Sequence, residues 1–190
     1  MGFLKHEKVS KPEEKIKEQQ GYYEIPERYE IIEGIRYDFL SSPKYVHQKL
    51  LTNLHLAFHS SCNQEGEILF APLDVHFDED NIVQPDLIYI ARERINIIRD
   101  GYIFGVPDLE VEILSESTGK RDKTIKKKMY EKFGVKEYWL VDPLYRLAEQ
   151  FVLDNGRYQL AATLTEQDVL KALTISCLII DLNNIFPKEA

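Results

Sequence analysis

The sequence lacks any long apolar run. Nowhere in its 190 residues does a stretch approach the ~20 apolar residues that a membrane-spanning helix needs. Its opening, MGFLKHEKVSKPEEKIK, carries charges where a secretory signal peptide requires an apolar segment. These absences predict a cytoplasmic protein that does not bind a membrane.

Cysteine is scarce as well. The chain holds two, Cys62 and Cys177, and they lack the Cys-x-x-Cys spacing. The pattern implies neither a disulfide framework nor a thiolate zinc cage, so we expect free thiols. His55, His59 and Cys62 lie on one face of an expected helix at a spacing that could bind zinc, but no fourth ligand is evident.

Glycine-rich phosphate-binding motifs are also absent. No dinucleotide-binding fingerprint occurs in the chain. Gly119-Lys120 is not a phosphate loop, because the earlier glycine is missing and Arg121 replaces the serine or threonine. The sequence therefore contains no motif that predicts a nucleotide-binding site.

The net charge is −8, and it is unevenly distributed. An acidic chain argues against a protein that coats nucleic acid, because neutralising phosphates requires clustered Lys and Arg. Residues 119–136 nevertheless hold eight basic residues against two acidic ones, a local charge of +6. Such a run is typical of a solvated helix face, and it is also a patch that could bind a phosphodiester.

The length fits one α/β domain. Residues 1–20 mix Lys and Glu without apolar periodicity, which predicts a mobile leader ahead of a domain over 21–190. The stretch 28–40 has two β-prone runs around Glu33-Gly34 and predicts a hairpin. A helix is expected over 43–63, where an apolar stripe is formed by His47, Leu51, Leu54 and Phe58.

Short β-rich segments follow. We expect strands of one sheet at 67–77, 82–90 and 107–114. A basic helix over 121–133, ended by Gly134, leads to a buried strand at 135–142, and this βαβ unit favours parallel pairing. A last hairpin turns at Asn155-Gly156. The predicted architecture is an α/β fold with a mixed sheet flanked by helices, in which ligands bind at strand ends.

Carboxylates fall on two of the expected strands. QPDLIYI, residues 84–90, opens with a Pro-Asp pair. One interpretation of this pair is purely structural: a turn in which Asp86 accepts hydrogen bonds from nearby amides. In PDLEVEIL, one face of the strand is acidic because apolar residues alternate with Asp108, Glu110 and Glu112. That face is solvated if the strand lies at an edge, and otherwise its carboxylates must be paired, hydrated or bound to metal.

Asp86 and Glu112 on neighbouring strands offer the hard oxygen ligands that Mg²⁺ or Mn²⁺ prefers. Such an ion can lower the pKa of a water molecule and neutralise charge that builds on a phosphate. A cation at Lys126, in the basic helix, could orient a nucleophile there. The aromatic residues nearby are expected in the core rather than as base-stacking platforms: Tyr130, Tyr138 and Trp139.

Three segments in this order and spacing carry a family resemblance: QPDL, PDLEVEILSEST and RDKTIKKKMYEKFGVKEYWLVDP. From about Tyr29 to Pro187 the chain resembles the Uma-two family of endonucleases, within the restriction-endonuclease-like PD-(D/E)XK superfamily. The resemblance implies a restriction-endonuclease-like α/β core and a divalent-metal phosphodiesterase site. By position, it implies that Asp86 and Glu112 are the metal ligands.

The sequence departs from the superfamily pattern at one position. The lysine expected two residues after the glutamate is absent, because that position is Leu114. The resemblance implies that the lysine has moved to the next helix. Lys126 is the matching position there, and Lys127 and Lys128 are its rivals.

Two further residues match positions that the family tends to fill with these residue types. They are Glu33, in the first hairpin, and His47, which lies on an apolar stripe and so fits a core histidine equally well. The prediction is a Mg²⁺-dependent or Mn²⁺-dependent endodeoxyribonuclease that hydrolyses DNA phosphodiester bonds. Its site would hold Asp86, Glu112, Lys126, His47 and Glu33, and a homodimer would let two sites address two strands.

Two other functions stay open. The absent lysine and the acidic net charge fit a non-catalytic nucleic-acid or protein-binding module on the same fold, which would bind DNA in a salt-dependent way without cleaving it. The same carboxylates could also serve a small-molecule metallohydrolase. Turnover of a simple phosphodiester without duplex binding would favour that third function.

Overall fold

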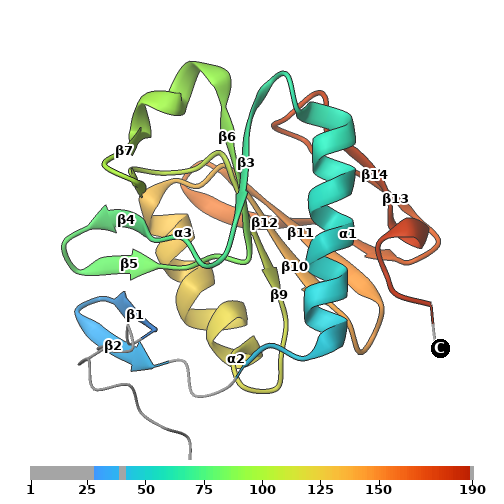
Figure 1. Ribbon diagram of the computed structural model, residues 1–190, viewed down its shortest axis with the longest axis horizontal. Coiled ribbons are helices and arrows are strands. Elements are labelled where there is room, and N and C mark those ends of the chain that lie inside the picture. The colour runs from blue at the N-terminus through green and yellow to red at the C-terminus, as the bar shows by residue number, and fades with distance from the viewer. Residues whose placement is uncertain (1–27, 39–41, 189–190) are drawn as a thin grey trace, which may run out of the picture.

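The structure, a computed structural model, describes residues 28–38 and 42–188 (Figure 1). The leader expected over 1–20 lies outside the described residues. Two six-stranded sheets and one two-stranded sheet organise this part of the chain. Within it, no helix is long and apolar enough to cross a membrane.

The first six-stranded sheet, which we call the central sheet, has the strand order β12-β11-β10-β9-β6-β3. Its strands are β3 (Gly66–Phe70), β6 (Leu87–Ala91), β9 (Leu109–Ile113), β10 (Glu137–Asp142), β11 (Leu147–Asp154) and β12 (Arg157–Thr165). β9 and β10 pair in parallel, and the other neighbours are antiparallel. The mixed sheet and its parallel βαβ unit are therefore as predicted.

The second six-stranded sheet, which we call the flanking sheet, has the order β2-β1-β5-β4-β8-β7. Its strands are β1 (Tyr29–Ile32), β2 (Ile35–Asp38), β4 (Val75–Asp78), β5 (Asn81–Val83), β7 (Ile98–Arg99) and β8 (Tyr102–Phe104). The prediction of one sheet containing strands 67–77 and 82–90 is wrong. Each segment breaks at a proline, Pro72 or Pro85, and its halves join different sheets, because proline has no N–H to donate to a ladder.

Both predicted hairpins form. Glu33 and Gly34 have φ angles of 52° and 72°, and Asn155 and Gly156 have φ angles of 49° and 76°. Two successive left-handed residues match the right-handed twist of the strands that they join, which is why Asn-Gly is favoured in such turns.

The predicted helices also form. They are α1 (Tyr45–Cys62) and a run of α2 (Gly119–Arg121), one π-helical turn (Asp122–Lys126) and α3 (Lys127–Phe133). Gly134, with φ of 83°, ends this run as expected. The remaining elements are two 3₁₀ turns (Arg92–Ile97 and Leu182–Asn184) and the paired strands β13 (Val169–Lys171) and β14 (Ile179–Asp181).

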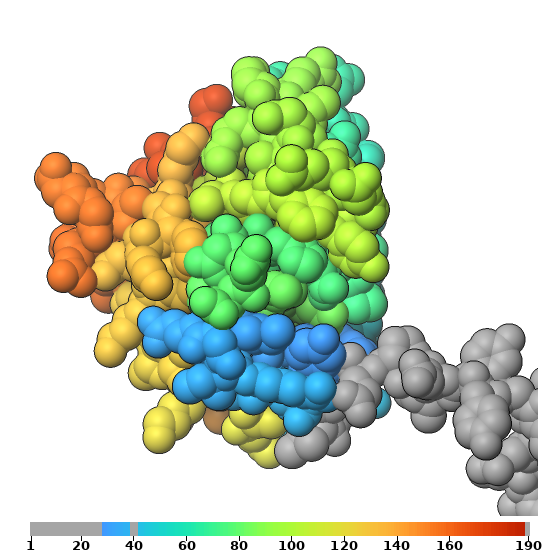
Figure 2. All heavy atoms as spheres, turned by 90° about the vertical axis from the view of Figure 1, so that its left-hand side faces the viewer, coloured from blue at the N-terminus to red at the C-terminus, as the bar shows by residue number. Residues whose placement is uncertain are grey.

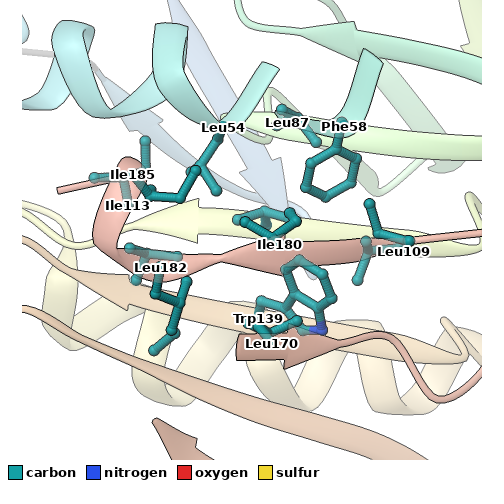
Figure 3. Close-up of a cluster of buried hydrophobic side chains, with 14 of the residues drawn as sticks. Leu54, Phe58, Leu87, Leu109, Ile113, Trp139, Leu170, Ile180, Leu182 and Ile185 are labelled. Carbon is teal, nitrogen blue, oxygen red and sulfur yellow. The ribbon is translucent and has the colours of Figure 1, made fainter. Parts of the chain in front are cut away.

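The middle strands of the central sheet, β6, β9 and β10, are buried on both faces, whereas β12 at one edge is largely exposed. One face packs against α1 and the C-terminal segment, with Leu54 and Phe58 of α1 above Trp139 of β10 (Figure 3). The other face packs against α3 and the flanking sheet. All five residues of β9 are buried, so the alternative of a solvated edge strand at 107–114 is wrong. The expected core aromatics Tyr130, Tyr138 and Trp139 are all fully buried.

The prediction of free thiols is also wrong. Cys62, at the end of α1, forms a disulfide with Cys177, just before β14, with their Cα atoms 5.4 Å apart. The two positions are separated by 115 residues, so only the fold brings them together. The disulfide also removes Cys62 from the zinc spacing with His55 and His59.

Candidate active site

Asp86 and Glu112 meet across two paired strands. In the antiparallel pairing of β6 and β9, Leu87 lies opposite Val111, so one further step along the register places Asp86 opposite Glu112. The side chain of Asp86 accepts a 2.7 Å hydrogen bond at Oδ2 from the backbone N–H of Ile113. The Gln-Pro-Asp turn therefore leaves the flanking sheet and sets a carboxylate at the mouth of the central sheet.

His47, from the first turns of α1, contacts this carboxylate. Its Nε2 lies 3.0 Å from Oδ1 of Asp86, and the two side chains keep 15% and 17% of their surface exposed. Burial alone would lower the pKa of His47, but the hydrogen bond and the charges of Asp86 and Asp122 outweigh it and raise the pKa above its ordinary value. His47 is therefore a partner of the Asp86 carboxylate.

Lys126 reaches Glu112 from the basic helix. Its Nζ donates a 2.6 Å hydrogen bond to Oε1 of Glu112, and Tyr130 donates a 2.8 Å bond to the same oxygen. Residues four apart lie on one helical face, so both donors point at the same strand. Burial would lower the pKa of Lys126, but the carboxylates around it raise the pKa, so the lysine stays charged.

The two rival lysines lie elsewhere. Lys127 has its Nζ 3.5 Å from the centroid of the Phe151 ring, and Lys128 is exposed. Of the three adjacent lysines, Lys126 is the one that the helix turns toward the strand carboxylates.

Glu30 of β1 completes the surroundings of this lysine. Its Oε1 lies 2.6 Å from Nζ of Lys126 and accepts a 3.1 Å hydrogen bond from the backbone N–H of Gln84. Its Oε2 lies 3.4 Å from a guanidinium nitrogen of Arg121. Figure 2 shows the hairpin of β1 and β2, in blue, lying against the yellow helical run that carries these basic residues.

The structure does not bring Glu33 to the site. Glu33 is exposed at the turn of the hairpin, where its backbone N–H donates to Asn81. The hairpin carboxylate that faces the site is Glu30, three positions earlier, on the inward face of β1. The sequence signal for it was the alternation in YEII, where Glu30 and Ile32 share one side of the strand.

Two more buried carboxyl groups were missed. Asp122, in the π-helical turn, is 2% exposed, and its burial raises the pKa of its carboxyl to about 6 although the charge of Lys126 opposes this. Glu110 lies two residues before Glu112 on the same face of β9, and burial raises its pKa well above the ordinary value. An acidic residue between Arg121 and Lys123 in a basic run was the available signal for Asp122.

The donor set fits a magnesium or manganese ion. Within the described chain, no group of three or more His, Cys, Asp or Glu side chains is arranged to hold a metal. Mg²⁺, however, typically takes one or two carboxylates and fills its other positions with water and substrate phosphate. Asp86 and Glu112 provide such a pair. Both donors to Glu112 bond to Oε1, which leaves Oε2 for a metal.

The charge balance points the same way. Burial raises the pKa of Glu112 well above its ordinary value against the opposing charge of Lys126, and the nearby carboxylates add to this rise: Asp122, Asp86 and Glu30. A divalent cation would relieve this excess of negative charge.

Comparisons with known proteins identify the family and the fold of the chain. The model of the Uma2 family, described as "Putative restriction endonuclease", matches residues 19–182. A crystal structure titled as a putative nuclease belonging to DUF820, from Anabaena variabilis ATCC 29413, is 19% identical, with a TM-score of 0.65 over 85% of this chain and 93% of that one. No curated protein matches the chain. The likeness to the Anabaena protein confirms the predicted restriction-endonuclease-like fold.

A second solved structure has weaker similarity. The type IIG restriction endonuclease BpuSI is 14% identical, with a TM-score of 0.38 over 73% of this chain and 15% of that one. This chain thus spans a small part of the length of that enzyme.

Proposed function

The chain belongs to the Uma2 family of restriction-endonuclease-like proteins, and from that premise we propose that it is a metal-dependent nuclease that hydrolyses DNA phosphodiester bonds. The observation that carries the proposal is the contact of Lys126 with Glu112, opposite Asp86. The two carboxylates lie where β6 begins and β9 ends, and Lys126 brings a cation to them from the helix. This cation takes the place of the strand lysine that is absent because position 114 is Leu114.

Each residue has a distinct part in the reaction. Asp86 and Glu112 would hold Mg²⁺ or Mn²⁺, which would supply stabilisation of the charge that develops on the phosphate. Lys126 orients the water whose oxygen bonds to phosphorus as the P–O ester bond breaks. Tyr130 fixes the rotamer of Glu112, and His47 holds the carboxylate of Asp86.

Nicking of supercoiled plasmid tests the proposal. With Mg²⁺ or Mn²⁺ present, the wild-type protein should convert the supercoiled form to the open circle. Glu112→Gln and Lys126→Ala should each lower the rate by at least about 100-fold, the usual scale for a positioned proton-transfer or charged group. Lys128→Ala, an exposed lysine of the same helix, is the matched control and should cleave like wild type.

Binding of Mn²⁺ gives a second readout that does not depend on cleavage. Calorimetry should show weaker binding to Asp86→Asn and Glu112→Gln, and unchanged binding to Lys128→Ala. Unchanged metal affinity in both carboxamide variants, with folding intact, would contradict the assigned metal ligands. Salt-dependent DNA binding without cleavage or metal binding would instead select the non-catalytic module.

A further inference from the structure

Three large apolar side chains are more exposed than any others in the described part of the chain. They are Leu144, Tyr45 and Tyr145, with 79%, 76% and 71% of their surface exposed. A contiguous exposed apolar patch marks a contact surface, whereas apolar residues that are exposed singly do not. All three belong to segments that begin or end beside the candidate site.

Tyr45 lies on the α1 side of the site. It is the first residue of α1, two positions before His47, whose ring contacts Asp86. Its neighbour Lys44 forms a 3.1 Å ion pair with Glu116, in the loop that follows β9. The start of α1 is therefore held against the end of the strand that carries Glu112.

Leu144 and Tyr145 lie on the β10 side. Their backbone N–H groups donate to Oδ1 of Asp142, at 2.9 and 3.1 Å, which fixes the turn after β10. In the parallel pairing of β10 with β9, Val141 lies opposite Ile113, so the turn at 143–146 begins two residues past that pair, at the carboxyl end of the strand that carries Glu112. The start of α1, α2 and the end of β9 lie at the lower end of the view in Figure 1.

Exposed lysines accompany these side chains. Lys123 is 48% exposed, and its Nζ lies 3.9 Å from Oδ2 of Asp142, at the base of the turn. Lys120 is exposed and makes no ion pair with any described residue. We call Tyr45, Leu144, Tyr145, Lys120 and Lys123 the rim.

A nucleic acid strand has the complementary chemistry. Its phosphates are anionic, and its bases stack on aromatic rings when they are not paired, whereas a regular duplex keeps its bases inside. Exposed tyrosines beside lysines suit a strand whose bases are accessible. They contribute little to the contact with an undistorted duplex, where binding goes mainly through phosphates.

We propose that the rim binds unpaired bases of a DNA strand next to the bond that the site cuts, with Tyr45 and Tyr145 as stacking platforms and Lys120 and Lys123 on the phosphates. This rests on the proposed nuclease function for the identity of the bound polymer. The preferred substrate is single-stranded or locally unpaired DNA.

Fluorescence anisotropy tests this with a labelled oligothymidylate and a blunt duplex of equal length, in EDTA so that no cleavage occurs. The wild-type protein should bind the single strand more tightly than the duplex. Tyr45→Ala and Tyr145→Ala should each weaken single-strand binding by about 5-fold to 150-fold, the range measured for loss of one base-stacking residue. Tyr45→Phe and Tyr145→Phe, which keep the rings, should bind like wild type.

Tyr102→Ala is the matched control, because Tyr102 is 46% exposed on β8 of the flanking sheet. It should leave single-strand binding unchanged. Preference of the wild type for duplex, or unaltered single-strand binding by the Tyr45→Ala and Tyr145→Ala double variant, would overturn the proposal. Plasmid nicking separates the rim proposal from the nuclease proposal. If the protein nicks plasmid but its binding does not depend on the two tyrosines, the rim proposal alone is overturned. If binding depends on the tyrosines but no nicking occurs, the result supports the rim and counts against the nuclease.

Discussion

Nζ of Lys126 lies 2.6 Å from Oε1 of Glu112, which joins a helix to a central strand across 14 positions of sequence. Both residues are buried, at 2% and 4% exposure. The strand position where the superfamily has its lysine is Leu114, which is 7% exposed and packs in the core. The positive charge beside Glu112 therefore comes from a helix rather than from the strand. We expect removal of the Lys126 side chain to affect stability as well as the proposed activity.

Replacing Lys126 with methionine should strongly destabilise the protein. The change leaves Glu30 and Glu112 buried without their shared cation, and removing one partner of a buried ion pair costs about 3–5 kcal/mol. Urea denaturation at neutral pH measures the free energy of unfolding directly. Lys128→Met, on the exposed face of the same helix, should change it by less than about 0.5 kcal/mol.

A double-mutant cycle sharpens this prediction. If Lys126 and Glu112 interact as the geometry indicates, Glu112→Gln should cost less stability in the Lys126→Met background than in wild type. Additive losses would contradict a direct interaction between the two side chains.

Glu30 should act as a positioning residue. Glu30→Gln keeps the shape of the side chain but removes one of the two charges that hold Lys126, so we expect nicking to slow by about 10-fold to 100-fold, the scale of lost outer-shell partners. The reduction should fall on kcat, with KM for plasmid and Mn²⁺ affinity unchanged. Glu33→Gln, at the exposed turn of the same hairpin, should behave like wild type. Equal effects of the two variants would contradict the assignment.

The strand carboxylates and the helix lysine were predictable from the sequence for a physical reason. Glu112 lies in β9 and Asp86 directly precedes β6, and continuing the antiparallel register of these two strands by one step sets the two residues opposite each other. Lys126 was the position that the family resemblance implied, with Lys127 and Lys128 as rivals, and helical periodicity places Lys126 on the same face as Tyr130.

The remaining site residues left weaker local signals, and packing decides which of them face the site. Glu30 rather than Glu33 faces the site because the inward side of β1 is set by contact with the helical run. Asp122 is buried inside a segment whose composition is that of a solvated helix face. The disulfide and the division into two sheets likewise arise from contacts between segments far apart in the chain.

Asp108 should make stability depend on pH in the acid range. Burial alone would raise its pKa, but hydrogen bonds from Lys136, the backbone of Ala91 and Arg94 outweigh it and lower the pKa. A carboxyl with a lower pKa in the folded state stabilises the protein above its unfolded pKa of about 3.9, and this contribution disappears as the pH falls through the folded value.

The variant Asp108→Asn isolates this contribution. At pH 7 it should be less stable than wild type by about 2 kcal/mol, the scale of hydrogen bonds to a charged group. The difference should narrow below pH ~4, where the Asp108 carboxyl of the unfolded chain takes up a proton before that of the folded protein does. Asp100→Asn, at an exposed turn with φ of 53°, is the control and should show no such pH-dependent difference. A constant difference between wild type and Asp108→Asn from pH 7 to pH 3 would contradict the lowered pKa.

Reduction of the Cys62–Cys177 disulfide should destabilise the fold without altering the site. The bond closes a loop of 115 residues, and removing a native disulfide of this kind costs about 2–5 kcal/mol, largely because the unfolded chain regains freedom. The disulfide lies at the end of α1, whereas His47 lies near its start. Plasmid nicking at 25 °C should therefore stay the same while the urea midpoint falls.

The double variant Cys62→Ala and Cys177→Ala separates the disulfide from other effects of a reductant. Its urea midpoint should match that of the reduced wild-type protein and should not respond to dithiothreitol. Thiol counting under denaturing conditions verifies the oxidation state of each sample. A wild-type midpoint that stays fixed when the thiols are shown to be reduced would mean that the packing of α1 against β14 holds this region without the bond, as the hydrogen bond from Ser61 to Ile179 already does in part.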